Sequence, residues 1–227
     1  MTRTPASPKR QHGATLLFAL LTLVALMLST LALVRSTDIA ALLMGNLGFK
    51  QDATASSEQA TREAVAWLSA NLAALNVDDT DHGYYASTKE VVATPPGISP
   101  VDATGTQLSD ASRQLIDWDD DDCDAASSGT FAACELTPVP LDDTINGNSA
   151  SYIIFRMCDK SGDLSTDSTI NCVRPMNANA GGSPVKGDLS YAEPSRFGSA
   201  ASPYYRIIVR VQGARNTVSF TETIVHF

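Results

Sequence analysis

The stretch ATLLFALLTLVALMLSTLALV, residues 14–34, determines how the rest of the sequence is interpreted. It holds 21 consecutive residues without a charged side chain, in a chain of 227 residues. At about 1.5 Å of rise per residue, a helix of this length is roughly 30 Å long, which matches the hydrocarbon core of a bilayer. The sequence therefore predicts one membrane-spanning helix near the N-terminus.

The basic residues around this stretch are distributed unevenly. Arg3, Lys9 and Arg10 precede it, whereas Arg35 follows it and has Asp38 close by. The positive-inside rule places the more basic flank in the cytoplasm. We therefore expect a single-pass inner-membrane protein whose N-terminus is cytoplasmic and whose remaining chain is exported to the periplasm.

The exported part is acidic. The formal net charge of the whole chain is -9, although three of its basic residues lie before the span. Nucleic acids and anionic lipid headgroups are polyanions, so an acidic domain argues against both as partners.

All four cysteines, Cys123, Cys134, Cys158 and Cys172, fall in the exported part, where thiols tend to be oxidised. Three disulfide pairings are possible. The two local ones, Cys123 with Cys134 and Cys158 with Cys172, are favoured because each closes a short loop rich in Ser, Gly and Asp. A zinc site is the competing interpretation, but the sequence contains no CxxC pair and its histidines are distant.

A basic leader, residues 1–13, ends in Gly13, and the apolar helix begins directly at Ala14. The sequence PKRQHGATLLFALLTL resembles the processing site of type IV prepilins and pseudopilins. In that family an inner-membrane aspartyl peptidase cuts after the glycine and methylates the new N-terminus. The resemblance implies cleavage between Gly13 and Ala14, with the helix kept first as a membrane anchor and later in the filament core. An uncut signal anchor with an incidental glycine is the alternative.

The residues after the span extend this resemblance. STDIAALLMGNLGFKQDATASSEQATREAVAWL is similar to the N-terminal region of minor pilins of the PilX kind, in which a Met-Gly-Asn segment precedes an Ala- and Glu-rich helix. Met44, Gly45 and Asn46 match that segment. The resemblance covers about residues 9–75. It implies an α+β, pilin-like fold in which a long N-terminal helix packs against an antiparallel β-sheet with disulfide-bonded loops.

Position 18 departs from the family pattern. Most pilins have a glutamate at the fifth residue of the mature chain, where its carboxylate neutralises the N-terminal amine of a neighbouring subunit in the apolar filament core. Here that residue is Phe18. Family members that lack the glutamate include the type II secretion minor pseudopilin K, which caps the filament tip. The hypothesis that follows is a tip or initiating position.

The sequence predicts four segments: the leader 1–13, the transmembrane and filament-core helix 14–35, its amphipathic continuation 36–76, and an extracytoplasmic globular domain 77–227. Gly45 interrupts the continuation, as does Gly48, and each predicts a weak point or bend because glycine costs up to about 1 kcal/mol in a helix interior. The apolar stripe of the continuation follows helical spacing. Its members are Ala60, Ala64, Trp67, Leu68, Asn71, Leu72 and Leu75.

Three segments of the globular domain have the alternation and composition of strands. Residues 151–159, SYIIFRMCD, form the first, and residues 204–212 and 217–227 flank GARN as a C-terminal β-hairpin, 204–227. We expect these strands to cover the apolar stripe of the long helix. Residues 107–118 are interpreted as a short helix.

An acidic run between residues 117 and 124 suggests a calcium site, because this ion prefers oxygen ligands on a loop. The weak candidates are Asp117, Asp119 and Asp121. The EF-hand spacing fails, since Asp122 stands where glycine is needed and Ser128 where the closing acid is needed. A solvated acidic loop without metal is therefore favoured.

The inventory for catalysis is small. Of the three histidines, His12 lies in the leader, and neither His82 nor His226 has a neighbouring Ser, Cys or acid at a spacing typical of a triad. The sequence also has no phosphate-binding glycine loop. A non-enzymatic protein without a cofactor is expected.

The leading hypothesis is a minor pilin, PilX-like, that takes part in initiation and tip assembly of a type IV pilus, and so in twitching motility and adhesion. The resemblance implies as partners the prepilin peptidase, other minor pilins, the major pilin, a tip adhesin and the inner membrane. Two alternatives stay open: a minor pseudopilin of a type II secretion system, and an uncleaved signal-anchored envelope protein that binds or hydrolyses a ligand.

Overall fold

The computed structural model describes residues 14–93, 96–107, 111–175, 202–213 and 216–227. The leader 1–13, including Gly13, lies outside the described residues. By its internal contacts the chain divides into two compact units, Met1–Gly48 and Phe49–Phe227.

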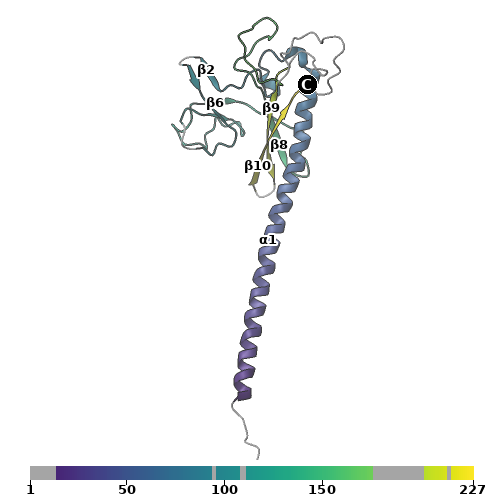
Figure 1. The fold of residues 1–227 in the computed structure, drawn as a ribbon, viewed down its shortest axis with the longest axis vertical. Helices are drawn as coiled ribbons and strands as arrows, with labels where there is room; N and C mark the ends of the chain where they lie inside the picture. The colour runs from purple at the N-terminus through teal and green to yellow at the C-terminus, as the bar shows by residue number, and fades with distance from the viewer. Residues whose placement is uncertain (1–13, 94–95, 108–110, 176–201, 214–215) are drawn as a thin grey trace, which may run out of the picture. The chain divides into compact units, whose positions relative to one another are not determined.

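Helix α1 (Ala14–Ala70) has 57 residues and contributes to both units (Figure 1). It continues without a break through Gly45 and Gly48, so neither glycine ends the helix as an interruption would. Leu, Met, Ala, Lys and Gln surround them, and these strong helix formers offset a cost of about 1 kcal/mol per glycine. The boundary between the two units nevertheless falls directly after Gly48.

Helix α1 ends at Ala70, before the predicted end near Asn76. The backbone N–H of Asn71 is shared between the carbonyls of Trp67 and Leu68, at 3.1 and 3.2 Å. The Asn71 side chain also donates to the Trp67 carbonyl at 2.8 Å. These bonds tighten the last turn, and a 3₁₀-helix, η1 (Leu72–Ala74), follows.

The main sheet combines two predicted strand regions with short strands that the sequence did not reveal. Its order is β1 (Tyr84–Tyr85), β8 (Ser149–Arg156), β9 (Tyr205–Gly213) and β10 (Thr217–Val225), and β7 (Val139–Pro140) also pairs with β8. The antiparallel β9–β10 hairpin confirms the predicted one. The sheet is mixed rather than purely antiparallel, because β1 runs parallel to β8.

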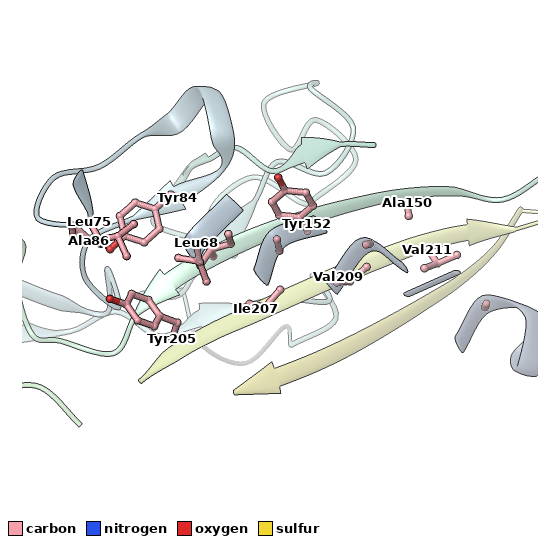
Figure 2. Packing of buried hydrophobic residues seen from close by; sticks show 14 residues of the cluster. Leu68, Leu75, Tyr84, Ala86, Ala150, Tyr152, Tyr205, Ile207, Val209 and Val211 are labelled. Carbon is pink, nitrogen blue, oxygen red and sulfur yellow. Dashed lines mark hydrogen bonds between the residues drawn. The ribbon is translucent and has the colours of Figure 1, made fainter. Parts of the chain in front are cut away.

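The register of β8 and β9 separates two apolar faces. Ile154 lies opposite Ile207, and Tyr152 lies opposite Val209. These side chains pack with Leu68 of α1 in one buried cluster (Figure 2). Its buried members are Ala53, Ala60, Ala64, Leu68, Leu75, Tyr84, Ala86, Ala150, Tyr152, Ile154, Tyr205, Ile207, Val209 and Val211.

The opposite face of the sheet packs against a smaller layer of parallel strands, β4 (Val101–Asp102), β5 (Gln114–Ile116) and β6 (Ala133–Leu136). The buried cluster between them consists of Tyr85, Val101, Ile116, Leu136, Ile153, Phe155 and Ile208. Two further strands, β2 (Val91–Ala93) and β3 (Pro96–Ile98), pair only with each other among the described residues. A 3₁₀-helix, η2 (Thr80–His82), precedes β1.

The short helix predicted for residues 107–118 is wrong. Part of that segment, Gln114–Ile116, is strand β5, and Leu115 and Ile116 are both buried. Burial of these two side chains depends on β4 and β6, which are distant in sequence, and this tertiary pairing overrides the local preference.

Candidate functional site

The first unit presents an apolar surface. Helix α1 is the one described helix that is long and apolar enough to cross a membrane, and none of its most apolar stretch is buried within the chain. The exposed large side chains in this half of α1 are Leu16, Leu17, Phe18, Leu20, Leu21, Leu23, Val24, Leu26, Met27, Leu28, Leu31, Leu33, Val34, Ile39, Leu42, Leu43, Met44 and Leu47. A continuous surface of this kind marks a membrane or protein interaction site.

Two predicted site residues lie in the first two turns of α1. Ala14 is the first residue of α1, and Phe18 lies one turn later with 66% of its surface exposed. Cleavage between Gly13 and Ala14, methylation of Ala14 and a special role for Phe18 all stay predictions, since Gly13 lies outside the described residues.

In the second unit, polar contacts attach α1 to the turn that precedes β8. Asn148 is 5% exposed, and its side-chain amide donates to the Asp52 carboxylate at 2.6 Å and to the Ser56 hydroxyl at 3.1 Å. Asn146 donates to the other carboxylate oxygen of Asp52 at 3.2 Å. These bonds fix the position of α1 on the sheet at the point where its buried alanine stripe begins.

Arg156, at the end of β8, is 1% exposed and joins three parts of the second unit. Its guanidinium donates to the carbonyls of Ala86 at 2.8 Å, Leu75 at 3.1 Å and Gly162 at 2.9 Å. It also reaches the Asn76 side chain at 3.3 Å and the Lys160 carbonyl at 3.4 Å. Backbone oxygens thus compensate the buried charge, and Arg156 holds these three segments together.

The disulfides are the two local ones that the sequence favours. Cys123 is bonded to Cys134, and Cys158 is bonded to Cys172. The second bond closes the loop that supplies the Gly162 carbonyl to Arg156, and Cys158 itself is 1% exposed.

The acidic loop is organised by hydrogen bonds. The carboxylate of Asp117 is buried and accepts the backbone N–H groups of Asp121 and Asp122, at 3.0 and 3.1 Å. Asp119 instead pairs with Arg210 at 2.7 Å. The structure therefore does not bring the three weak metal candidates, Asp117, Asp119 and Asp121, together as one ligand set.

Asp117 does lie near the sulfurs of Cys123 and Cys134, and the three ligand atoms fall within 4.8 Å of one another. Both sulfurs are consumed in the disulfide, so they are not thiolate ligands. The proximity reflects the way in which the disulfide and the Asp117 carboxylate close the same loop.

A buried ion pair anchors the small parallel layer. The Arg113 side chain is 1% exposed and that of Asp102 is 3% exposed, and Arg113 donates to Asp102. Burial acts to raise the pKa of the Asp102 carboxyl, but hydrogen bonds from Gln107, Thr104 and Arg113 outweigh it and hold the pKa below its ordinary value. This pair was not evident in the sequence, because nothing near Asp102 or Arg113 indicates burial.

Two histidines have defined surroundings. His82 contacts the Asp79 carboxylate through Nδ1 at 2.9 Å and stacks on Trp67 with ring centroids 5.2 Å apart. His226 Nε2 lies 3.1 Å from the Ser202 hydroxyl, a proximity that sequence distance concealed. No described carboxylate bonds to the His226 ring, so the acid of a hydrolase triad is not among its described contacts.

Comparisons of the chain with models of protein families, with curated proteins and with solved structures find no match.

Proposed function

We propose that this protein is a membrane-anchored minor pilin of the PilX kind, which takes part in initiation or tip assembly of a type IV pilus. The observation that carries the proposal is the difference between the two halves of α1. Its first half exposes apolar side chains over more than thirty residues, whereas its second half packs on a mixed sheet. The leader ending at Gly13 before this helix adds the resemblance to a prepilin processing site.

The physical role proposed for the exposed half of α1 is packing. In the bilayer, lipid tails surround its leucines, and removal into a filament is favourable only when other helices replace the lipid. Partner helices from sibling minor pilins and the major pilin meet this requirement. The cytoplasmic basic leader fits cleavage by a prepilin peptidase before extraction.

Phe18 gives the proposal its position in the filament. An apolar residue at the fifth mature position cannot neutralise the amine of a subunit placed above it. A subunit at the tip has no such neighbour, so it tolerates Phe18 without an unpaired buried charge. We therefore place this protein at the tip or in the initiating bundle.

The test of the anchor is the chemical identity of the N-terminus. Mass spectrometry of the membrane-extracted protein should find N-methylalanine at residue 14, and the full leader when the prepilin peptidase is deleted. The variant Gly13→Asp should keep its leader, whereas Gly48→Asp, a glycine substitution away from the site, should be processed normally. An intact Met1 in cells with active peptidase contradicts the proposal.

Location tests the tip assignment separately. Immunogold labelling should place the protein at pilus ends, and Phe18→Glu should allow labelling along the shaft. Labelling along the shaft of wild-type filaments contradicts the tip position. Deletion should remove surface pili and twitching; blocked export of folded enzymes with normal pili identifies a secretion pseudopilin instead.

A further inference from the structure

Within the described part of the chain, strand β10 is the open edge of the main sheet. Its nine residues pair with β9 on one side, and no other described strand pairs with it on the other side. The opposite edge differs, because the two-residue strands β1 and β7 both cover β8. Figure 2 shows β10 as the outermost of the three long strands.

This edge lacks the features with which proteins usually prevent strand addition. Its sequence, TVSFTETIV, has no proline, glycine or lysine, and its register with β9 is one-to-one over all nine residues without a bulge. Its single charge, Glu222, is paired with Arg206 at 3.0 Å. Long edges with regular unpaired backbone groups are templates for another strand.

A groove runs beside the edge on the face that carries α1. It has a volume of about 390 Å³ and is lined by Thr54, Ser57, Glu58, Thr61, Arg62, Thr221 and Thr223. The hydroxyls of Thr54, Ser57 and Thr61 donate to carbonyls of their own helix. The Thr221 hydroxyl is buried and has no hydrogen-bond partner among the residues that the structure describes, so the β10 wall holds a polar group that these residues leave unsatisfied.

We propose that β10 binds an extended segment of a different polypeptide, which adds to the sheet as a further strand and fills this groove. The backbone edge determines the class of occupant, since only an extended chain matches its alternating N–H and C=O groups. The added polypeptide also supplies a hydrogen-bond partner for the Thr221 hydroxyl.

The two faces of β10 define the side chains of the occupant. Thr221 and Thr223 face the groove, where Glu58 and Arg62 offset each other in charge, so small uncharged side chains fit there. On the other face, Val218 is 41% and Ile224 is 54% exposed, so apolar side chains fit there. The occupant therefore alternates small hydroxyl residues with aliphatic ones.

A second copy of this chain fits less well. Antiparallel pairing of two β10 strands requires a two-fold axis perpendicular to the sheet, and this axis reverses the α1 segment packed on the sheet. Phe49, at which this segment joins the apolar unit, would then point in opposite directions in the two copies. The two chains would therefore leave the paired sheets at opposite ends.

The probe for the edge is a capped nine-residue peptide of alternating threonine and valine, added to the full-length protein in detergent micelles. Residue-resolved hydrogen exchange should show fast exchange at alternate β10 amides in the free protein and slowing at those amides with the peptide. Two control peptides carry N-methyl groups, one on every threonine and the other on every valine. Each set of N-methyl groups removes the N–H donors from one edge of the peptide. The peptide methylated on the edge that faces β10 should bind about tenfold or more weaker, and the other should bind normally.

A charge directed into the groove should also block the peptide. Thr221→Lys should weaken binding about tenfold or more, whereas Thr166→Lys, at an exposed loop position, should bind like the wild type. Thermal unfolding of both variants in the same micelles separates blocking from loss of fold. If Thr221→Lys unfolds, binding of the two methylated peptides to the wild-type protein tests strand addition instead.

Four outcomes overturn the inference. Slow exchange at all β10 amides of the peptide-free monomer means that the chain covers its own edge. A dimer that forms with this protection identifies a second copy as the occupant. Unchanged β10 exchange at saturating peptide, or equal binding of both methylated peptides, shows that strand addition does not occur. None of these outcomes depends on N-terminal processing, so the proposed pilin function is tested independently.

Discussion

At the scale of single residues, Arg156 joins three parts of the second unit. It bonds to residues on the segment after α1, on the chain after β1 and in the 158–172 disulfide loop. Because the Ala86 carbonyl is buried with it, loss of the guanidinium removes the donor to that acceptor and to the part-buried Gly162 carbonyl, whereas the Leu75 carbonyl keeps its bond from the Tyr84 hydroxyl.

Replacement of Arg156 by methionine should lower the free energy of unfolding by about 2–5 kcal/mol, as expected for a broken buried polar network. Urea unfolding of the full chain in micelles, followed by tryptophan fluorescence, measures the change. The matched control is Arg206→Met, whose partly exposed ion pairs should contribute about 1 kcal/mol or less. Equal losses in the two variants would contradict the role given to Arg156.

The pH dependence of the Asp102–Arg113 pair has a definite sign. The folded pKa of Asp102 lies below its ordinary value of 3.8, so its contribution to stability is complete above that value. It is lost as the pH falls through the folded pKa. Asp102→Asn should therefore destabilise the protein at pH 7, and its difference from the wild type should narrow below about pH 4.

Chemical unfolding of the wild type and Asp102→Asn at several pH values between 3 and 7 tests this behaviour. Asp119→Asn, which removes the exposed partner of Arg210, is the control and should change stability little at any pH. A difference for Asp102→Asn that is independent of pH would mean that the carboxylate charge is not what stabilises the layer.

At the scale of elements, the docked part of α1 depends on small side chains. Ala60 and Ala64 are fully buried, and Ala53 nearly so, against β8 and β9. Alanine at these positions lets the helix approach the sheet closely, and larger side chains have no free volume to occupy.

Ala60→Leu and Ala64→Leu should each lower the free energy of unfolding by about 1–3 kcal/mol through overpacking. Ala66→Leu, on the exposed face of the same helix, should be nearly neutral because leucine and alanine have similar helix propensities. Thermal unfolding followed by circular dichroism compares the three. A neutral Ala64→Leu variant would show that the helix–sheet contact is looser than its burial indicates.

Sequence periodicity was sufficient for elements whose burial is set locally. The apolar run 14–34 and the alternation of residues 204–227 predicted α1 and the β9–β10 hairpin. Strands β4 to β7, with two to four residues each, are too short to show a period. Strand β5 was misread as helix because its burial comes from partners about twelve and twenty residues away.

The polar centres were harder to predict than the strands. Arg156 left one signal, a charge directly after the apolar run YIIF that requires buried partners. Its partners could not be identified, because they are backbone carbonyls assembled by the fold. The local disulfides were accessible from sequence, since loop length favours nearby cysteines.

At the scale of the whole molecule, the two units differ in the solvent that suits them. The first exposes leucine, valine and methionine side chains, whereas the second buries its apolar residues in two clusters. The first unit therefore needs lipid or partner helices around it.

A charge at the centre of the apolar run should weaken the anchor. Val24→Arg should raise the free energy of membrane insertion by about 2.5–3.5 kcal/mol. The fraction of protein that sediments with carbonate-washed membranes should therefore fall. Leu43→Arg, beyond residue 34, should leave that fraction unchanged. Equal membrane retention of Val24→Arg and the wild type would contradict a spanning role for residues 14–34.

The position of Asp52 at the first docked turn of α1 determines how the second unit carries tension. A force applied through residues 14–48 reaches this unit at Phe49, and its component along the docked part of α1 acts parallel to the sheet on which that part packs (Figure 1). The Asp52–Asn148 bond and the alanine contacts that follow it then share the load in shear. Such contacts yield together rather than peeling apart one by one, so the docked helix is suited to being pulled.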